Sequence, residues 1–393
     1  MKTDIVIVGG GVAGLGAAIA LAPHGLDVTV IERRAEVGGI HRGDSLLPKS
    51  VALLTRWGLR GALVRAGGRP IYRMEIHAPG TSEAFEVPLT RHDAEHPYHV
   101  LPHARLEAVL MEAALAFPNV HVLRPASFVD LVRHTATGRV AGVRYRRGDA
   151  IEDVSCRLVV AADGQHSAVR KRAGIAFDAY RYDHAYFGLE SDRPPGYRDA
   201  MRVHFHAEGG ALLMPHPDRI GVGILVEAGS AKRWMTMSEA ALSCELVKRA
   251  PILSGVTLHL KGAHVYELCR AHAQRYASDG VVLIGDSAHC ANPTAGQGMA
   301  MALSDAGALA DVLGPAWRDD ARAVDALVHR YQARQWTINQ RLVWRAHWLA
   351  KLYSLRGHAW TRAKALGVMA LARPALHRLT RPVLERFILD PRA

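Results

Sequence analysis

Three groups of glycines and acidic residues, far apart in the chain, have the composition and spacing of a dinucleotide site. In the first group, residues 9–14 read GGGVAG and complete a GxGxxG motif. The first glycine of such a motif permits a tight turn, the second lets a pyrophosphate approach the backbone, and the third lets a helix pack closely on a strand. Glu32 follows Gly14 after 18 residues and is placed to accept hydrogen bonds from a ribose.

The other two groups each begin with an acid that follows an apolar run. Asp163 precedes Gly164, and residues 285–299 read GDSAHCANPTAGQGM, with Asp286 at the start. An acid at the end of a strand can bind sugar hydroxyls. A glycine-rich loop that opens a helix presents free N–H groups and the positive end of the helix dipole. Such a helix end stabilises an anion, and we expect that anion to be a reduced flavin ring.

The elements that must position these residues can be read from hydrophobic patterning. Four short runs of β-branched and apolar residues predict buried strands at 4–8, 27–31, 158–162 and 281–284. Residues 15–22 predict the helix after the first motif, which ends at Pro23. Strand, glycine turn, helix and a terminal acid on the next strand form a dinucleotide-binding unit, and this motif alone leaves NAD and FAD open.

The order and spacing of the three groups resemble the class A flavoprotein monooxygenases, the para-hydroxybenzoate hydroxylase-like family. The resemblance covers residues 1–335. It implies FAD as cofactor, NADPH or NADH as co-substrate and O₂ as oxidant, with hydroxylation of an aromatic or quinoid small molecule through a flavin 4a-hydroperoxide. Three alternatives stay open: epoxidation by the same intermediate, reduction of isoprenoid double bonds as in geranylgeranyl reductases, and non-catalytic flavin binding.

The resemblance also assigns roles to individual residues. It places Asp163 near the pyrophosphate and links it to NAD(P)H use, and it places Asp286 at the ribityl and pyrophosphate region. Arg42 and Arg105 look like the two flavin-side arginines of the family, with an ordinary surface role as the alternative. The predicted cofactor site comprises Gly9, Gly11, Ala13, Gly14, Glu32, Arg33, Arg42, Arg105, Val129, Asp163, Asp286, Pro293, Gly296, Gln297, Gly298 and Met299. The predicted catalytic residues are Pro293, His216 and Arg42.

Because the three groups are separated, one flavin domain must be assembled from several stretches. The predicted FAD-binding domain comprises 1–70, 99–180 and 275–335. Strand-like runs and turn residues between them predict an inserted antiparallel sheet from 71–98 and 181–274, with a helix at 235–248. The fold class is therefore α/β: a Rossmann-like FAD domain of the GR2 type, an inserted substrate-binding sheet, and C-terminal helices at 336–393.

The substrate pocket is expected between the inserted sheet and the flavin. Its candidate residues are His99, His184, Tyr186, Phe187, His204, His206, Met214, Pro215 and His216. His216 is the best placed histidine, since the corresponding stretch borders the flavin in the family. A base there could raise the electron density of a phenol ring. For every histidine an ordinary structural role is the alternative.

Positive charge gathers at the C-terminal end. The chain has 49 basic and 37 acidic residues, and residues 330–393 hold 13 of the basic residues but only two of the acidic ones. Four of the seven tryptophans fall in the same segment: Trp336, Trp344, Trp348 and Trp360. Three interpretations stay open: helices packed on the flavin domain with a solvated basic face, contact with an anionic membrane surface, and docking of an acidic carrier protein. No nucleic-acid motif accompanies the charge, so no nucleic-acid partner is predicted.

Composition and cysteine usage bound the remaining possibilities. With 49% hydrophobic and 22% charged residues, the chain has the composition of an ordinary globular protein, which excludes a disordered chain. The four cysteines form no CxxC pair, which predicts a reducing compartment and neither a disulfide scaffold nor a metal site. Asp4 and five glycines interrupt the N-terminal apolar run, so it is not taken as a signal peptide. We expect a cytoplasmic protein, with peripheral contact to the inner face of the membrane through the basic helices.

Overall fold

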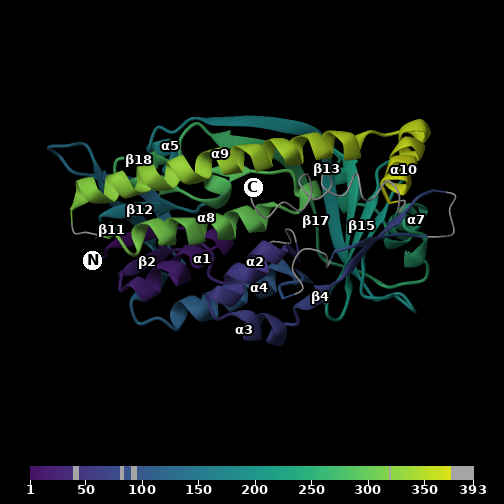
Figure 1. Ribbon diagram of the computed structural model, residues 1–393, viewed down its shortest axis with the longest axis horizontal. Helices are drawn as coiled ribbons and strands as arrows, with labels where there is room; N and C mark the ends of the chain where they lie inside the picture. Colours follow the sequence, from purple (N-terminus) through teal and green to yellow (C-terminus); the bar gives the residue numbers. More distant parts are fainter. Residues whose placement is uncertain (39–43, 80–83, 90–94, 318–319, 373–393) are drawn as a thin grey trace.

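The computed structural model describes residues 1–38, 44–79, 84–89, 95–317 and 320–372. Two halves lie side by side along the longest axis of the molecule, as Figure 1 shows. One half is built on a mainly parallel sheet and contains the N-terminus. The other half is built on a large, mainly antiparallel sheet, and one long helix runs along both.

The parallel sheet contains all four strands predicted from the apolar runs. Its parallel strands are β1 (Ile5–Val8), β2 (Val28–Ile31), β8 (Val120–Leu123), β12 (Leu158–Ala161) and β19 (Val281–Leu283). The spatial order is β8-β2-β1-β12-β19, and the short β18 (Ala277–Ser278) adds an antiparallel edge. Every residue of β1, β2 and β12 is buried, as expected for central strands covered on both faces.

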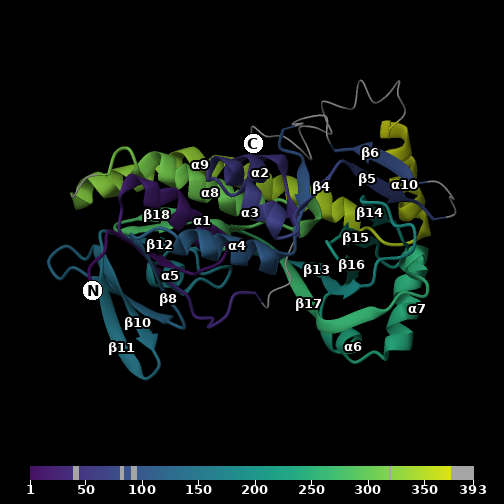
Figure 2. The same cartoon turned by 90° about the horizontal axis from the view of Figure 1, so that it is seen from below.

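Helices and a second, small sheet cover the parallel sheet. The helices are α1 (Val12–Leu21), α4 (His103–Leu115), α8 (Gly298–Leu313) and α9 (Ala321–Ser354). Helix α1 packs against α4 and α8, and α9 packs on α8. A three-stranded antiparallel sheet of β9 (Ser127–Arg133), β10 (Val140–Arg147) and β11 (Ala150–Ser155) contacts β12 through β10. Figure 2 shows this small sheet projecting below β12.

Elements from the segment between β2 and α4 lie where the two halves meet, and we call this region the seam. It contains α2 (Pro48–Arg56), α3 (Arg60–Arg65) and a three-stranded sheet of β3 (Ser45–Leu46), β4 (Arg69–Ile71) and β7 (Tyr98–Val100). Apolar side chains of this small sheet contact both α8 and the large sheet.

The large sheet has eight strands drawn from separated parts of the chain. In spatial order they are β20 (His289–Cys290), β17 (Leu258–Ala273), β13 (Phe177–Ser191), β16 (Ile220–Glu227), β15 (Ala211–Pro215), β14 (Met201–His204), β5 (Arg73–His77) and β6 (Phe85–Pro88). Neighbouring strands of this sheet are antiparallel except β5 and β14, which run parallel. The prediction of a wholly antiparallel sheet is therefore corrected at this pair. No hairpin joins these two strands, so their relative direction is not constrained by a turn.

One face of the large sheet is covered by two short helices in place of the single helix predicted at 235–248. They are α6 (Ala231–Met235) and α7 (Glu239–Arg249). The break occurs because Ser238 caps the second helix: its side chain accepts a hydrogen bond from the backbone N–H of Ala241.

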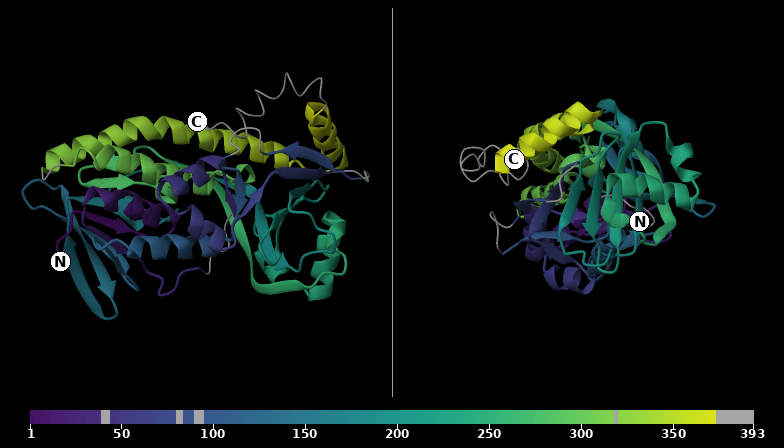
Figure 3. Two further views of the ribbon diagram at one scale, coloured as in Figure 1. Left: turned by 60° about the horizontal axis from the view of Figure 1, so that its bottom comes forward. Right: turned by 90° about the vertical axis from the view of Figure 1, so that its right-hand side faces the viewer.

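Helix α9 is 34 residues long and runs without interruption through the predicted domain boundary at 335/336. No glycine or proline occurs within it, so nothing in the local sequence ends the helix there. It ends shortly before Gly357, whose φ is +95°, and α10 (His358–Ala372) follows at an angle (Figure 3). Pro374 and Pro382, where the sequence would break the predicted C-terminal helices, lie outside the described residues. Among the helices that the structure describes, none is long and apolar enough to cross a membrane.

Candidate flavin site and the adjoining sheet face

The loop between β1 and α1 is built around two backbone contacts that only glycine allows. Gly9 has a φ of +110°, and a Cβ there would collide with the carbonyl oxygen of Ala162. A Cβ on Gly14 would overlap the carbonyl oxygen of Gly9. At Gly11, by contrast, a Cβ would meet only a carboxylate oxygen of Glu107, at 3.8 Å. The fold itself therefore requires the first and third glycines, whereas the space at the second is left for a ligand.

Two helix N-termini offer free backbone N–H groups at this edge of the sheet. Helix α1 begins after Gly11 with no side-chain cap from the described residues and no acid in its first turn. Helix α8 begins at Gly298 in the same way, and a Cβ on Gly298 would touch nothing within 4 Å. Uncapped helix N-termini bind anions. The two ends suit the pyrophosphate and the flavin ring of an FAD, respectively.

Glu32 ends β2 and is fixed by three donors. Its Oε2 accepts a hydrogen bond from the N–H of Gly10 at 2.6 Å, and its Oε1 accepts from the N–H and Nε of Arg34 at 2.8 and 3.0 Å. Arg34 also reaches Glu107 on α4, at 3.1 Å. Burial alone would raise the pKa of Glu107, but hydrogen bonds from His103 and Arg34 hold that pKa below its usual value. Arg34, which makes these contacts, was not singled out from the sequence. Its neighbour Arg33 is exposed, and cofactor contact by Arg33 stays a prediction.

The two carboxylate oxygens of Asp163 differ in their hydrogen bonding. Its Oδ2 accepts from the backbone N–H groups of Ala168 and Val169, at 2.7 and 3.1 Å, and so caps α5 (Ala168–Arg172). Its Oδ1 is buried with no hydrogen-bond partner among the described residues, and burial raises the pKa of the carboxyl. A buried oxygen of this kind is costly unless a ligand satisfies it, which fits a cofactor hydroxyl or N–H.

Arg170, which the sequence analysis did not single out, ties the second group to the third. The side chain is buried and donates from Nη1 to the carbonyl oxygen of Ser287 at 2.7 Å. Its guanidinium lies 3.6 Å from the ring centroid of Phe177. The turn that carries Asp286 is thereby held against α5.

The turn around Asp286 is also anchored from inside the protein by Asp305 of α8. Asp305 is completely buried and accepts hydrogen bonds from the N–H of Gly285 at 2.9 Å and from Nδ2 of Asn339 on α9 at 2.8 Å. Its Oδ2 lies 2.7 Å from Nε2 of His289. The signal for this network was an acid in an otherwise Ala/Met/Leu-rich helix, where a charge needs partners. It was missed because the partners come from distant segments.

The motif residues therefore meet at the carboxyl ends of β1, β2, β12 and β19, where ligands bind in open α/β sheets. Gly9 touches Ala162, and a Cβ on Gly285 would meet the Cβ of Ala13 at 2.7 Å. Gly296 has a φ of +63° and ends the short turn η4 (Pro293–Ala295) just before α8. These positions offer groups that an FAD could use, namely two helix N-termini and an unsatisfied buried carboxylate oxygen, and ribose binding by Glu32 stays a prediction.

The large sheet presents its other face, the one not covered by α6 and α7, to the loop that opens α8. Thr294 in that loop has its Oγ1 3.4 Å from the hydroxyl of Tyr186. Gly188 and Gly223 pair directly across β13 and β16, so these two positions carry no side chain; His264 of β17 lies beside them, with its Cε1 3.5 Å from where a Cβ on Gly188 would stand. Apolar contacts join the face to α8 and the small sheet through Leu47, Ile71, Leu89, Tyr98, Val100, Met201, Met214 and Ala300. We call this face of the sheet, which includes Tyr186, Gly188, Leu212, Met214 and Gly223, the glycine face.

Strand alternation decides which predicted pocket residues reach the glycine face. Tyr186 and Met214 lie on it. Phe187 does not, because it points to the opposite face and stacks on Trp234, with ring centroids 5.4 Å apart. His204 is likewise on that opposite face and stacks on His77 at 4.2 Å.

Three other predicted histidines interact with residues next to them in the chain. A ring nitrogen of His99 lies near the carbonyl oxygen of Pro97, one of His184 near the carboxylate of Asp183, and one of His206 near the N–H of Glu208. Burial lowers the pKa of all three histidines. These contacts fit the structural alternative, whereas Nε2 of His184 is buried with no hydrogen-bond partner among the described residues. A pocket role for these histidines stays a prediction.

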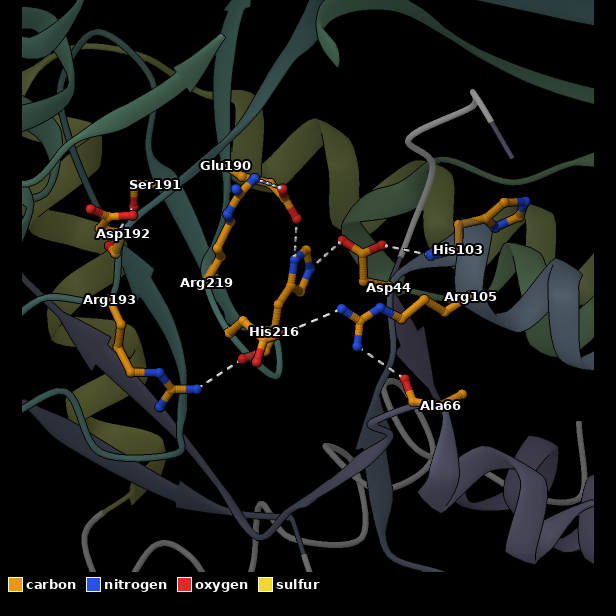
Figure 4. A network of polar contacts seen from close by, with 11 residues as sticks. Asp44, Ala66, His103, Arg105, Glu190, Ser191, Asp192, Arg193, His216 and Arg219 are labelled. Carbon is orange, nitrogen blue, oxygen red and sulfur yellow. Dashed lines mark hydrogen bonds and ion pairs between the residues drawn. The ribbon is translucent and has the colours of Figure 1, made fainter. Parts of the chain in front are cut away.

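His216 lies between two carboxylates that belong to different halves of the molecule (Figure 4). Its Nδ1 lies 2.9 Å from Oε1 of Glu190 on β13, and its Nε2 lies 3.0 Å from Oδ2 of Asp44, just before β3. Burial opposes a charge on the ring, but the two carboxylates outweigh it and raise the pKa of His216 to about 9. At neutral pH both ring nitrogens carry protons, so this arrangement gives no support to the catalytic role predicted for His216. It is an ionic clasp across the seam.

The remaining predicted residues are placed as follows. Arg105 extends to Asp218 and to the carbonyl oxygen of Ala66, both at 3.1 Å, and is exposed (Figure 4). Val129 is half-buried on β9. Arg42 lies outside the described residues. Flavin contact by these residues, and the oxygen-side role of Pro293, stay predictions.

Comparison with known proteins agrees with this geometry. A family model described as an FAD binding domain matches residues 2–346. The chain belongs to the class A FAD-dependent monooxygenases. As a monooxygenase of this family it is an FAD-dependent oxidoreductase, and the predicted family and fold class are confirmed.

Individual relatives of this monooxygenase differ in their reactions. The 3-demethoxyubiquinol 3-hydroxylase of Escherichia coli K12 is 30% identical over 358 residues, which cover 86% of each chain. Digeranylgeranylglycerophospholipid reductase 1 of Methanopyrus kandleri is 31% identical over 364 residues, covering 85% of this chain and 86% of that protein. The crystal structure of PqsL, a probable FAD-dependent monooxygenase from Pseudomonas aeruginosa, superposes with a TM-score of 0.79 at 25% identity. It covers 94% of this chain and 100% of that one.

The space at Gly11 gives a prediction that separates folding from cofactor binding. Gly11→Val should fold, because its Cβ meets only a carboxylate oxygen at 3.8 Å, and should purify largely without FAD, because the side chain occupies the place of the pyrophosphate. Gly14→Val is the contrasting control, and it should fail to fold because of the overlap with Gly9. FAD content by absorbance and folding by circular dichroism are measured. Normal FAD occupancy in Gly11→Val would mean that the pyrophosphate lies elsewhere.

The buried network predicts that Asp305 acts on FAD binding through the Asp286 turn. Asp305→Asn should lower the free energy of unfolding by on the order of 3 kcal/mol and weaken FAD binding, because buried donors lose a charged acceptor. Asp311→Asn is the matched control, since Asp311 lies on the same helix in an exposed ion pair with Arg56. Urea unfolding and FAD titration provide the two readouts. Identical behaviour of the two variants would contradict the anchoring role.

The clasp at His216 predicts a pH-dependent stability. The pKa of His216 in the folded protein, about 9, lies above its unfolded value of about 6.5. Its contribution is therefore complete below pH ~6.5 and disappears as the pH rises through about 9. At about 1.4 kcal/mol per pKa unit, the contribution is on the order of 3 kcal/mol.

The test is chemical denaturation from pH 6 to 10 of the wild type and His216→Asn, with His121→Asn on the exposed part of β8 as control. The stability difference between wild type and His216→Asn should be largest at pH 6 and shrink towards pH 10. Parallel curves would show that His216 carries no charge in the folded protein.

Proposed function

We propose that this enzyme hydroxylates a flat aromatic or quinoid small molecule, with NAD(P)H as reductant and O₂ as oxidant. Bound FAD would supply the redox chemistry, taking two electrons from NAD(P)H and passing one atom of O₂ to the substrate while the other leaves as water. The observation that carries the proposal is the glycine face, which lies directly against the loop that opens α8.

The glycine face favours a flat, uncharged ring. Gly188 and Gly223 leave a level surface between Tyr186 and Met214, and the neighbouring Leu212 on β15 adds a further apolar side chain. Apolar surfaces with few polar groups are typical of the walls of small-molecule sites. Glu190 also lies on this face of the sheet, but its carboxylate is already bound to His216 and Arg219. The proposed partners are thus an aromatic or lipophilic substrate and O₂.

The chain would position the ring and exclude water. Tyr186 and Thr294 close the gap between the sheet and the η4 turn at 3.4 Å, and burial raises the pKa of Tyr186. Its hydroxyl therefore stays protonated and can donate a hydrogen bond to a substrate oxygen. Exclusion of water and a fixed ring orientation are what the protein adds to flavin chemistry.

Reduction of isoprenoid double bonds is the second candidate. The similarity to a digeranylgeranylglycerophospholipid reductase supports it, and the same apolar face would suit an isoprenoid chain. The two reactions differ in their use of O₂, because only hydroxylation or epoxidation incorporates an oxygen atom.

The deciding experiment uses the purified FAD-bound protein with NADPH or NADH and a panel of phenols, quinones, quinolones and polyenes. Hydroxylation requires substrate-stimulated oxidation of NAD(P)H and a product heavier by one oxygen atom, labelled from ¹⁸O₂. Anaerobic formation of a product heavier by two hydrogens would establish the reductase instead.

The glycine face makes a prediction about the substrate alone. In Gly223→Val the new Cβ would meet Tyr186 Cδ1 at 3.9 Å and the carbonyl oxygen of Leu212 at 4.0 Å, which are ordinary contacts, so the fold should accept it. The side chain would stand where the ring lies, and KM should rise about tenfold or more, equivalent to about 1.4 kcal/mol of lost binding. FAD content should stay unchanged. Gly61→Val on α3 is the control, and an unchanged KM in Gly223→Val would place the substrate elsewhere.

A further inference from the structure

The C-terminal half of α9 is apolar on both its inner and its outer side. Its inner side is packed on the protein through Leu342, Val343, Ala346, His347 and Ala350. Its outer side carries Trp344, Trp348 and Leu352, which are 42%, 60% and 56% exposed. A spacing of four residues aligns these three side chains along one face of the helix. The outer side of α9 therefore presents large apolar side chains that a partner could bury.

Helix α10 carries two further exposed apolar side chains at the same end of the molecule. Trp360 and Leu366 are 52% and 65% exposed, whereas Thr361 and Ala365 face the protein. The C-terminal half of α9 and helix α10 lie at the end that holds the large sheet, away from the N-terminus (Figures 1 and 3). We call Trp344, Trp348, Leu352, Trp360 and Leu366 together the outer face.

The C-terminal helices themselves carry charge of one sign, and two exposed acids of the large sheet lie beside them. Glu227 pairs with Arg356, and Asp178 pairs with Arg270, which stacks on Trp344. Residues 330–372 contain eight lysines and arginines and no aspartate or glutamate. Arg341 and Arg345 lie on the same side of α9 as the tryptophans, three residues before Trp344 and Trp348 respectively, and Arg362 is exposed on α10.

We propose that the outer face docks on the surface of an anionic lipid bilayer. Helices that lie in a membrane interface combine large apolar side chains with lysine and arginine. Tryptophan favours the headgroup level, where its ring is half apolar and half polar. Basic residues are attracted to anionic lipid within a Debye length.

The position of the outer face connects it with the substrate, and this step rests on the proposed function. On the inner side of α9, Ala350 and Tyr353 pack in one cluster with Tyr186 and Leu225 of the large sheet. Docking would therefore bring the glycine face close to a bilayer, where lipophilic quinoid or isoprenoid molecules partition.

The test is co-sedimentation of the full-length FAD-bound protein with phosphatidylglycerol/phosphatidylcholine vesicles, and with phosphatidylcholine vesicles alone. The wild type should bind the anionic vesicles at low salt with a blue shift of tryptophan fluorescence, and should dissociate as salt is raised. The double variant Trp348→Ser/Leu352→Ser should bind the anionic vesicles at least about tenfold more weakly than the wild type. The matched control is Val64→Ser/Leu115→Ser, two similarly exposed apolar residues on the flavin half, which should bind like the wild type.

Three outcomes would overturn the proposal. They are no binding to anionic vesicles at low salt, equal binding by the wild type and the outer-face variant, and a concentration-dependent dimer without lipid that the outer-face variant abolishes. The last result would assign the outer face to a second copy of this chain. Sedimentation and fluorescence need no substrate, so failure of the proposed reaction and failure of docking are distinguishable.

Discussion

The backbone contact between Gly14 and Gly9 determines where the first helix can lie, and much of the site follows from it. Because neither residue has a side chain, α1 approaches β1 closely enough for its N-terminus to open at the carboxyl edge of the sheet. Helix α8 packs on α1, so its own N-terminus opens towards the same edge. Two positive helix ends are thus held a fixed distance apart before any ligand binds, and an elongated cofactor with an anionic centre and an anionic ring can use both.

Buried acids around this edge serve mainly to fix backbone. Asp305 holds the turn before Asp286, Asp163 caps α5, and Glu32 accepts the N–H of Gly10. A carboxylate is an effective anchor for N–H groups in a low-dielectric environment, because charge-assisted hydrogen bonds are stronger than neutral ones. Charge-assisted hydrogen bonds also act at the seam, where the carboxylates of Asp44 and Glu190 hold the imidazolium of His216.

Patterns in the sequence predicted the elements whose signals are local. The four buried strands, the helix after the first motif and the meeting of the three motif groups required only apolar runs, glycines and the rule for parallel sheets. The features that could not be predicted depend on the direction in which a side chain or strand runs, or on contacts between segments far apart in the chain. Arg33 and Arg34 are adjacent and chemically identical, and only the course of the loop decides which one reaches Glu32. The side of the sheet that Phe187 occupies depends on strand register, and the parallel pairing of β5 with β14 depends on how separated segments assemble. The Asp305 network joins three segments that no spacing rule connects.

Because α9 is uninterrupted, it holds the two ends of the molecule at a fixed distance and orientation. At about 1.5 Å per residue, its 34 residues span about 50 Å. Along this length α9 also contacts the η4 turn, and its Leu342 and Val343 pack on Met301 of α8. The loop that opens α8 is therefore held beside Trp344. Each residue added or removed within α9 before Trp344 would turn Trp344 and Trp348 by about 100° relative to the flavin half. The length of α9 thus sets which way these two tryptophans face relative to that loop.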